Sequence, residues 1–161
     1  MKRRILNERL AAVVATLRHG ELLYVGDSGG GTHKNALYRM DPDVEYIDLE
    51  AVTGSPSFED VVRTLAEAGD FEAAIVAEDM EDASPEYYKM LVELFGEEHV
   101  HKINFAPESY QLRDRCKAMV QTGDMGVHAN AVLVAGYPGG AIDIDILLGK
   151  KKYTTVPKSE R

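Results

Sequence analysis

Short apolar runs alternate with amphipathic segments along most of this chain of 161 residues, and no other feature constrains its fold as strongly. The apolar runs stop at glycine or polar residues, which is typical of buried strands; we expect strands at residues 22–25, 46–52, 71–77, 100–105 and 127–135. The intervening segments repeat apolar residues at helical spacing and predict helices at residues 8–19, 58–65, 85–95 and 107–120. Strands that alternate with helices indicate an α/β fold, a single domain with a mostly parallel central sheet and helices on its faces.

The composition argues against several classes of protein. The formal net charge of −9 disfavours binding to phosphate backbones, so we expect no nucleic-acid partner. No stretch approaches the roughly 18 apolar residues of a membrane span, and the basic start of the chain is not followed by a signal-peptide core, so we expect no membrane partner. The single cysteine, Cys116, excludes an intrachain disulfide and favours a cytoplasmic location.

The sequence changes character after Gly136. Isoleucine and aspartate alternate over residues 142–146, which favours an added edge strand, and the polar residues 157–161 are expected to be disordered. We therefore divide the chain into a domain of residues 1–136 and a C-terminal extension of residues 137–161.

A glycine-rich loop follows the first predicted strand. The run Gly26-Asp27-Ser28-Gly29-Gly30 coincides with the nucleophile pentapeptide of chymotrypsin-like serine proteases, but alternating strands and helices and a single cysteine contradict that fold. The residues after Gly31 do not complete a P-loop, and no helix opens directly after the loop as a dinucleotide site requires. What is left is a flexible loop whose backbone can approach a ligand closely.

Two residues beside the first strand point to chemistry. Ligands bind beyond the carboxyl ends of parallel strands, and Asp27 follows such an end. His19 precedes the strand and admits two interpretations, a histidine stabilised at a helix C-terminus or an acid–base residue. His99 and His101 alternate along another strand, but no third ligand accompanies them, so we expect no metal site.

Several stretches resemble, in order, the D-ribose pyranase and L-fucose mutarotase family. They are residues 5–20, 23–29, 54–58, 74–78, 122–124 and 129–136. The resemblance implies an isomerase that uses no cofactor, with His19 as the acid–base residue. It also implies that Asp27 and Asn130 bind sugar hydroxyls, together with Ala129 of the triplet on the last strand and Lys34 at the position of a lysine in the pyranase pattern.

The family likeness further implies a ring-shaped homo-oligomer, commonly a decamer, whose sites are shared between adjacent subunits. The chain departs from the family pattern at two site positions. His128 stands where the family has tyrosine, and Ala106-Pro107 where it has histidine or arginine. We assign His128 either orientation of the sugar or a second proton transfer. The loop between Asp27 and Pro56 is also longer than in the family.

Opening a cyclic hemiacetal needs a proton donated to the ring oxygen and another removed from the anomeric hydroxyl. Histidine suits both steps near neutral pH, which favours a mutarotase or pyranase acting on a monosaccharide. One alternative is an enzyme of this scaffold that acts on a modified or phosphorylated sugar or a glycosyl bond, with Lys34, Arg113 and Arg115 contacting an anion. Another is a sugar-binding transport accessory without catalysis.

Overall fold

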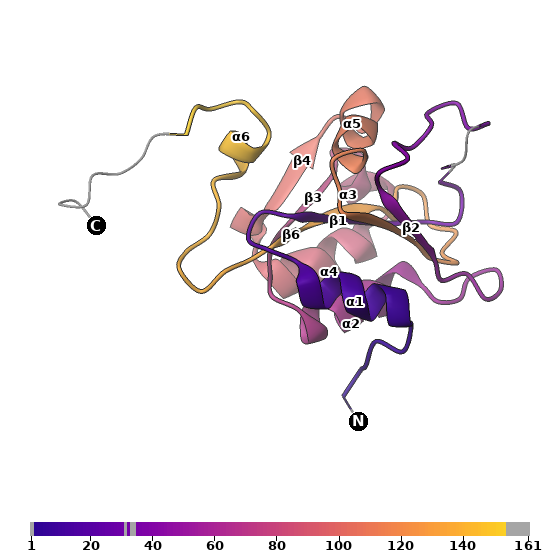
Figure 1. The fold of residues 1–161 in the computed structure, drawn as a ribbon. Coiled ribbons are helices and arrows are strands. Elements are labelled where there is room, and N and C mark those ends of the chain that lie inside the picture. The colour runs from indigo at the N-terminus through magenta and orange to yellow at the C-terminus, as the bar shows by residue number, and fades with distance from the viewer. Residues whose placement is uncertain (1, 31, 33–34, 154–161) are drawn as a thin grey trace.

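The computed structural model describes residues 2–30, 32 and 35–153 (Figure 1). Its strands are β1 (Leu22–Gly26), β2 (Glu45–Asp48), β3 (Phe71–Ala77), β4 (Val100–Ile103), β5 (Ala118–Gln121) and β6 (Ala131–Ala135). Its helices are α1 (Glu8–Thr16), α2 (Phe58–Ala68), α3 (Met80–Ala83), α4 (Pro85–Phe95), α5 (Tyr110–Arg113) and α6 (Ile144–Leu147), with short helical turns η1 (Glu97–His99) and η2 (Phe105–Ser109).

The strands form one sheet in the order β2-β5-β1-β6-β3-β4. β5 is parallel to both β1 and β2, and β3 is parallel to β4. β6 is antiparallel to both of its neighbours, β1 and β3, so those two run in the same direction. The predicted α/β fold with a mostly parallel sheet is therefore confirmed.

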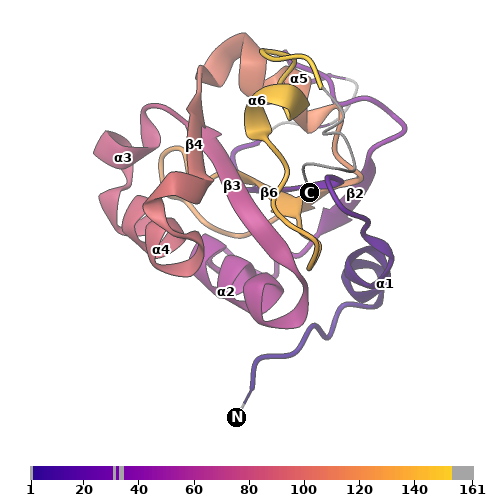
Figure 2. The ribbon, with the colours of Figure 1, turned by 90° about the vertical axis from the view of Figure 1, so that its left-hand side faces the viewer.

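Helices cover both faces of this sheet (Figures 1 and 2). β1 explains why, because every one of its residues is buried and successive side chains point to opposite faces. Leu23 and Val25 pack in the core with α1, α2 and α4. Leu22 and Tyr24 pack in a second core with α5 and α6. Burial on both faces gives the strand its uninterrupted apolar sequence.

The predicted helix over residues 107–120 is wrong. α5 ends at Arg113, and residues 118–121 form β5 between β1 and β2. The sequence imitates a helix here because apolar residues recur every four positions, at Leu112, Cys116 and Val120. However, Cys116 packs in the core with α5 and α6, whereas Val120 packs in the core with α1, α2 and α4 on the other face of the sheet. The chain leaves helical geometry before β5, where the backbone N–H of Lys117 donates to the carbonyl of Leu22 at 2.8 Å.

The predicted edge strand in the extension is also wrong. Residues 144–147 form α6, whose N-cap Asp143 accepts a hydrogen bond from the N–H of Asp145. Ile144 is buried in the core beside α5, so the isoleucines serve a helix packed on the sheet rather than a pleated edge. Residues 157–161, expected to be disordered, lie outside the described residues.

Two further elements, α1 and β6, are shorter than predicted. α1 ends at Thr16, so His19 lies in the turn that leads to β1, followed by Gly20 at φ 80°. β6 begins only at Ala131, because His128 adopts a left-handed conformation with φ 56°. In the part of the chain that the structure describes, no helix is both long and apolar enough to cross a membrane.

Candidate active site

Asp27 and Asn130 meet where the parallel strands end. Asp27 directly follows β1, and Asn130 directly precedes β6, whose antiparallel direction brings its start to that same edge. The Nδ2 of Asn130 donates to Oδ2 of Asp27 at 2.7 Å, and the backbone N–H of Asp27 donates to Oδ1 of Asn130 at 3.2 Å. The two residues therefore fix each other's orientation at the edge of the sheet where the parallel strands end.

The Asp27 carboxylate is partly removed from water. Burial raises the pKa of this carboxyl above its ordinary value of 3.8, while hydrogen bonds from Asn130 and from the N–H of Gly29 oppose that rise. The Gly29 bond, at 2.8 Å, reaches Oδ1. Each carboxylate oxygen has two lone pairs, so both retain acceptor capacity for a hydroxyl group of a ligand.

Gln121, at the end of β5, shapes the glycine-rich loop beside Asp27. Its Nε2 donates to the carbonyl oxygens of Asp27, Ser28 and Gly30 at 3.2, 3.3 and 3.0 Å. The hydroxyl of Tyr46 donates to its Oε1 and so fixes the amide. Gln121 was not among the predicted site residues, because residues 118–120 were expected to end a helix. The apolar run 118–120 before two polar residues was the signal in the sequence that could have indicated it.

The buried residue Asp124 connects the loops around this edge of the sheet. It is 5% exposed, and its carboxylate accepts hydrogen bonds from the N–H of Phe58 at 2.8 Å, the hydroxyl of Tyr87 at 2.6 Å and the N–H of Gly126 at 2.7 Å. Its backbone carbonyl accepts from the N–H of Ser28. One buried carboxylate thus connects the start of α2, helix α4 and the loop that carries Asp27.

A cavity of about 160 Å³ opens beside Asp27 and Asn130. Its lining also includes three aromatic residues, two glycines, a threonine, a methionine and an arginine: Tyr24, Phe105, Tyr110, Gly29, Gly30, Thr32, Met119 and Arg113. The mixture of apolar surface with a few polar groups is typical of a site for a small polar molecule.

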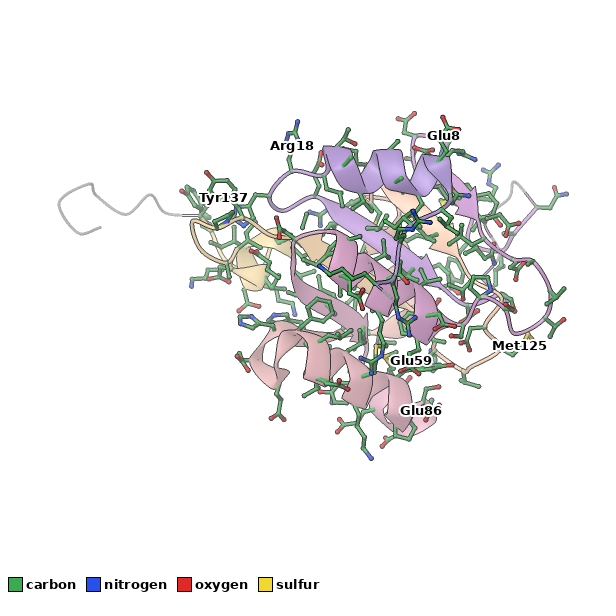
Figure 3. All side chains as sticks on the ribbon, turned by 90° about the horizontal axis from the view of Figure 1, so that it is seen from below. Glu8, Arg18, Glu59, Glu86, Met125 and Tyr137 are labelled. Carbon is green, nitrogen blue, oxygen red and sulfur yellow. The ribbon has the colours of Figure 1, made fainter. Side chains whose placement is uncertain are left out.

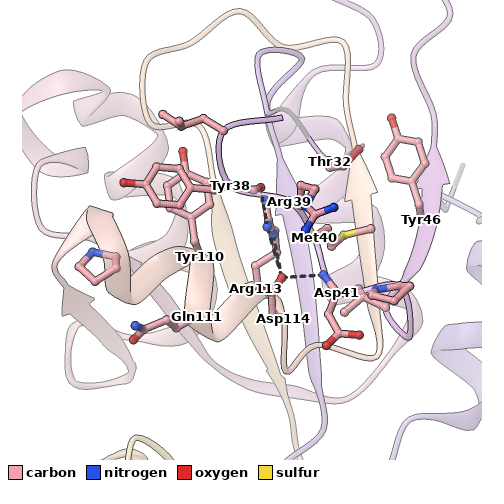
Figure 4. Close-up of a pocket in the computed structure, with 14 residues that line it drawn as sticks. Thr32, Tyr38, Arg39, Met40, Asp41, Tyr46, Tyr110, Gln111, Arg113 and Asp114 are labelled. Carbon is pink, nitrogen blue, oxygen red and sulfur yellow. Dashed lines mark hydrogen bonds and ion pairs between the residues drawn. The ribbon is translucent and has the colours of Figure 1, made fainter. Parts of the chain in front are cut away.

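A larger groove of about 1030 Å³ adjoins this cavity and shares Thr32, Tyr110 and Arg113 with it (Figure 4). Arg113 is 3% exposed and donates from Nη2 to the carbonyl of Tyr38 at 2.9 Å and to Asp114 at 3.2 Å. The rings of Tyr38 and Tyr110 stack with centroids 4.3 Å apart. Residues 38–46 and helix α5 thereby form the two walls of the groove.

His19 does not lie at this site. His19 precedes β1, whereas Asp27 follows it. A strand of five residues is roughly 17 Å long, so the two residues lie far apart. His19 instead contacts Glu72 at 3.2 Å and stacks on Tyr137 with ring centroids 5.8 Å apart. Figure 3 shows the same separation, with Tyr137 and Met125, which contacts Ser28 beside Asp27, at opposite ends of the molecule.

The remaining predicted site residues have different positions. The ring of His128 packs edge-on against Phe105, with centroids 4.6 Å apart. Ala129 is fully buried in the core, so its side chain faces away from the cavity. Lys34 lies outside the described residues. His99 is next to Glu98, and no group of three or more metal-ligating side chains occurs among residues 2–30, 32 and 35–153.

Comparison with known proteins identifies the family of this chain. Residues 1–138 match the model of the RbsD / FucU transport protein family. The chain belongs to this family. Over 135 residues it is 35% identical to the D-ribose pyranase of Symbiobacterium thermophilum, a match that covers 84% of this chain and 96% of that protein.

Solved structures of this family have the same fold. RbsD of Bacillus subtilis complexed with D-ribose superposes with a TM-score of 0.72 at 31% identity, covering 85% of this chain and 98% of that one. The fucose mutarotase of Streptococcus pneumoniae in complex with L-fucose gives a TM-score of 0.66 at 13% identity, covering 84% and 96%. That second likeness concerns the fold alone.

Proposed function

We propose that this chain interconverts ring forms of a monosaccharide as a pyranase or mutarotase, without a cofactor. The reciprocal Asp27–Asn130 pair at the cavity carries this proposal, because a fixed carboxylate and amide match the hydroxyl groups of a sugar. The D-ribose pyranases among its relatives, and the ribose complex of Bacillus subtilis RbsD, support a pentose such as ribose as substrate.

The proposed reaction needs only proton transfers. His19 removes the proton of the anomeric hydroxyl while water donates one to the ring oxygen. The bond between the anomeric carbon and the ring oxygen breaks, and an open-chain carbonyl forms. Closure on the other face gives the other anomer, and closure by another hydroxyl changes the ring size. Asp27 and Asn130 hold hydroxyls during these steps, and His128 orients the sugar or assists a transfer. General acid–base assistance of this kind is worth about 10²–10⁴-fold.

The separation of His19 from Asp27 makes oligomerisation part of the proposal. Two ends of one strand cannot contact the same monosaccharide, so the His19 of one subunit is proposed to reach the Asp27 cavity of its neighbour. Such a contact joins different surfaces of the two subunits, and contacts of this type form a ring when the rotation from one subunit to the next closes. The proposed assembly is therefore a ring-shaped homo-oligomer with sites at its subunit interfaces.

The proposal also covers the cellular location of the protein and the division of the chain into domains. A cytoplasmic location is supported by Cys116, a free thiol buried in the core. Residues 137–161 are proposed to be an addition to the domain of residues 1–136, since the family match ends at residue 138.

Exchange NMR on ribose and fucose tests the proposed activity. We expect the protein to accelerate exchange between ring forms, and both His19→Ala and Asp27→Asn to abolish that acceleration. His99→Ala, at a histidine far from the cavity, is the matched control and should retain activity. No acceleration by the unmodified protein, or full activity of His19→Ala, contradicts the proposal. Saturable sugar binding without acceleration supports a transport accessory instead.

The groove beside the cavity favours a second candidate, a sugar that carries a substituent. The groove is continuous with the cavity through Thr32 and Tyr110, and Arg39 and Arg113 line it. A phosphate or glycosyl group attached to the sugar would extend into this space. Activity on ribose 5-phosphate with none on ribose would favour this candidate over the free sugar.

A further inference from the structure

The surroundings of His19 indicate how this residue is prepared for proton transfer, an inference that rests on the proposed function. Its Nε2 lies 3.2 Å from Oε1 of Glu72, the second residue of β3. The Glu72 side chain is 13% exposed, against 33% for His19, so the contact is partly shielded from water. A carboxylate only accepts hydrogen bonds, so the nitrogen that faces it carries a hydrogen.

Glu72 is held in turn by the C-terminal extension. The N–H of Ile142 donates to the same Oε1 at 2.6 Å. The side chain of Ile142 approaches Gly20 so closely that a Cβ there would lie 3.0 Å from its Cδ1. The residue after His19 is therefore packed against the segment that orients the carboxylate.

The extension also covers the imidazole ring. Tyr137 stacks on His19 with an angle of 26° between the ring planes. The extension is anchored on the sheet, because Ile144 of α6 is buried and Arg115 donates from Nη2 to the carbonyl of Leu147 at 3.1 Å. The backbone N–H of Gly20 donates to the carbonyl of Ala135 at 2.9 Å, which fixes the His19 turn to the end of β6.

We propose that Glu72 and residues 137–142 position His19 in the tautomer with hydrogen on Nε2, leaving Nδ1 as the nitrogen that exchanges a proton with the sugar. The described residues form no hydrogen bond to Nδ1. When Nδ1 takes the proton of the anomeric hydroxyl, the imidazolium that forms is stabilised by the Glu72 carboxylate. Glu72 is thus a positioning residue, and Ile142 lies beyond the part of the chain that matches the family.

Nitrogen NMR of protein labelled at histidine tests this directly and does not depend on activity. At alkaline pH, where imidazoles are neutral, we expect the His19 shifts of the unmodified protein to show hydrogen on Nε2. In Glu72→Leu that preference should be lost. Hydrogen on Nδ1 in the unmodified protein, or an unchanged tautomer in Glu72→Leu, overturns the proposal.

Kinetics give the second readout. We expect Glu72→Leu to lower kcat about 10–100-fold with little change in KM, a loss of the size seen when a metal-ligating histidine loses the partner that orients it. Glu72→Gln keeps an acceptor oxygen and should recover part of that loss. Glu98→Leu is the matched control, because Glu98 also contacts a histidine, His99, at 3.6 Å, away from the cavity. Unchanged kcat in Glu72→Leu contradicts the positioning role.

Tyr137→Leu tests the stacking contact, with Tyr153→Leu as control within the same extension. Tyr153 is 72% exposed, so its replacement should leave kcat unchanged, whereas Tyr137→Leu should lower it several-fold. Equal kcat in the two variants argues against a role for the stack. Loss of activity in His19→Ala with normal activity in the Glu72 and Tyr137 variants would reject the positioning device and leave the proposed function standing.

Discussion

His19 and Asp27 lie at opposite ends of β1, so the strand separates the two side chains that the proposed reaction needs together. The arrangement follows from the topology. The edge where the parallel strands end gathers Asp27 and Asn130, whereas the opposite edge gathers His19, Glu72 and Tyr137. In the proposed assembly, each subunit would therefore contribute half of a site at each of these two edges.

Loss of the Asn130 amide should weaken sugar binding. In Asn130→Ala the Asp27 carboxylate loses a 2.7 Å hydrogen bond, and the orientation that this bond fixes is lost. Hydrogen bonds to charged groups contribute about 1.5–3 kcal/mol, so we expect ribose affinity to fall by about 10–100-fold. Calorimetric titration measures this. Asn104→Ala, at an exposed asparagine after β4, is the control, and equal affinities in the two variants would contradict the role of Asn130.

Acidification should weaken binding earlier than an ordinary aspartate would allow. Burial raises the pKa of Asp27, and only the ionised carboxylate accepts hydrogen bonds at both oxygens. As the pH falls, protonation therefore sets in above the ordinary value of 3.8, and affinity for ribose falls with it. Titrations between neutral pH and pH 4 measure the effect while circular dichroism reports folding. Constant affinity over that range in folded protein would argue against it.

The hydroxyl of Tyr87 should contribute measurably to stability. It donates to the buried carboxylate of Asp124 at 2.6 Å, and burial together with this carboxylate raises the pKa of Tyr87, so the hydroxyl keeps its hydrogen. Tyr87→Phe leaves one lone pair of a buried charge without its donor. We expect the free energy of unfolding to fall by about 1.5–3 kcal/mol in urea denaturation. Tyr153→Phe, at an exposed ring, should change it by less than about 0.5 kcal/mol; equal effects would contradict the inferred bond.

Gly123→Ala should also destabilise the fold. A Cβ at this position would lie 2.6 Å from both the backbone nitrogen and the backbone oxygen of Ser55, and backbone atoms cannot rotate away as a flexible side chain does. Overpacking of this kind costs about 1–3 kcal/mol. Gly30→Ala is the control for stability, because its Cβ would find its nearest neighbour at 3.6 Å. Equal midpoints of urea unfolding would show that the backbone at Ser55 adjusts freely.

The sequence predicted the elements whose pattern is purely local. β3 has the predicted bounds, and α1 begins where helical spacing begins, with the side chain of Asn7 accepting from the N–H of Leu10. β5 was missed because Cys116 and Val120 repeat at helical spacing although they pack on opposite faces of the sheet. The face of the sheet on which a side chain packs depends on the neighbouring strands, and a local sequence pattern carries no information about them.

The candidate site could also be predicted only in part from the sequence. Asp27 and Asn130 were named from the sequence, and their contact depends on β6 running antiparallel to β1. The neighbours of His19 were not predicted, because Glu72 reads as a polar interruption of an apolar strand and Tyr137 as the start of a tail. Their contacts with His19 form because the start of β1, the start of β3 and the end of β6 lie side by side in the sheet.

Mixing two variants that are each expected to be inactive tests the proposed shared site most directly. His19→Ala supplies an intact Asp27 cavity and Asp27→Asn supplies an intact His19, so subunits that exchange randomly within a ring should restore about a quarter of the sites. Exchange NMR on ribose should then show no acceleration with either variant alone and about a quarter of the unmodified rate with the equimolar mixture after refolding together. A mixture as inactive as its components, in oligomers shown to contain both variants, would contradict a site built from His19 of one subunit and Asp27 of the next.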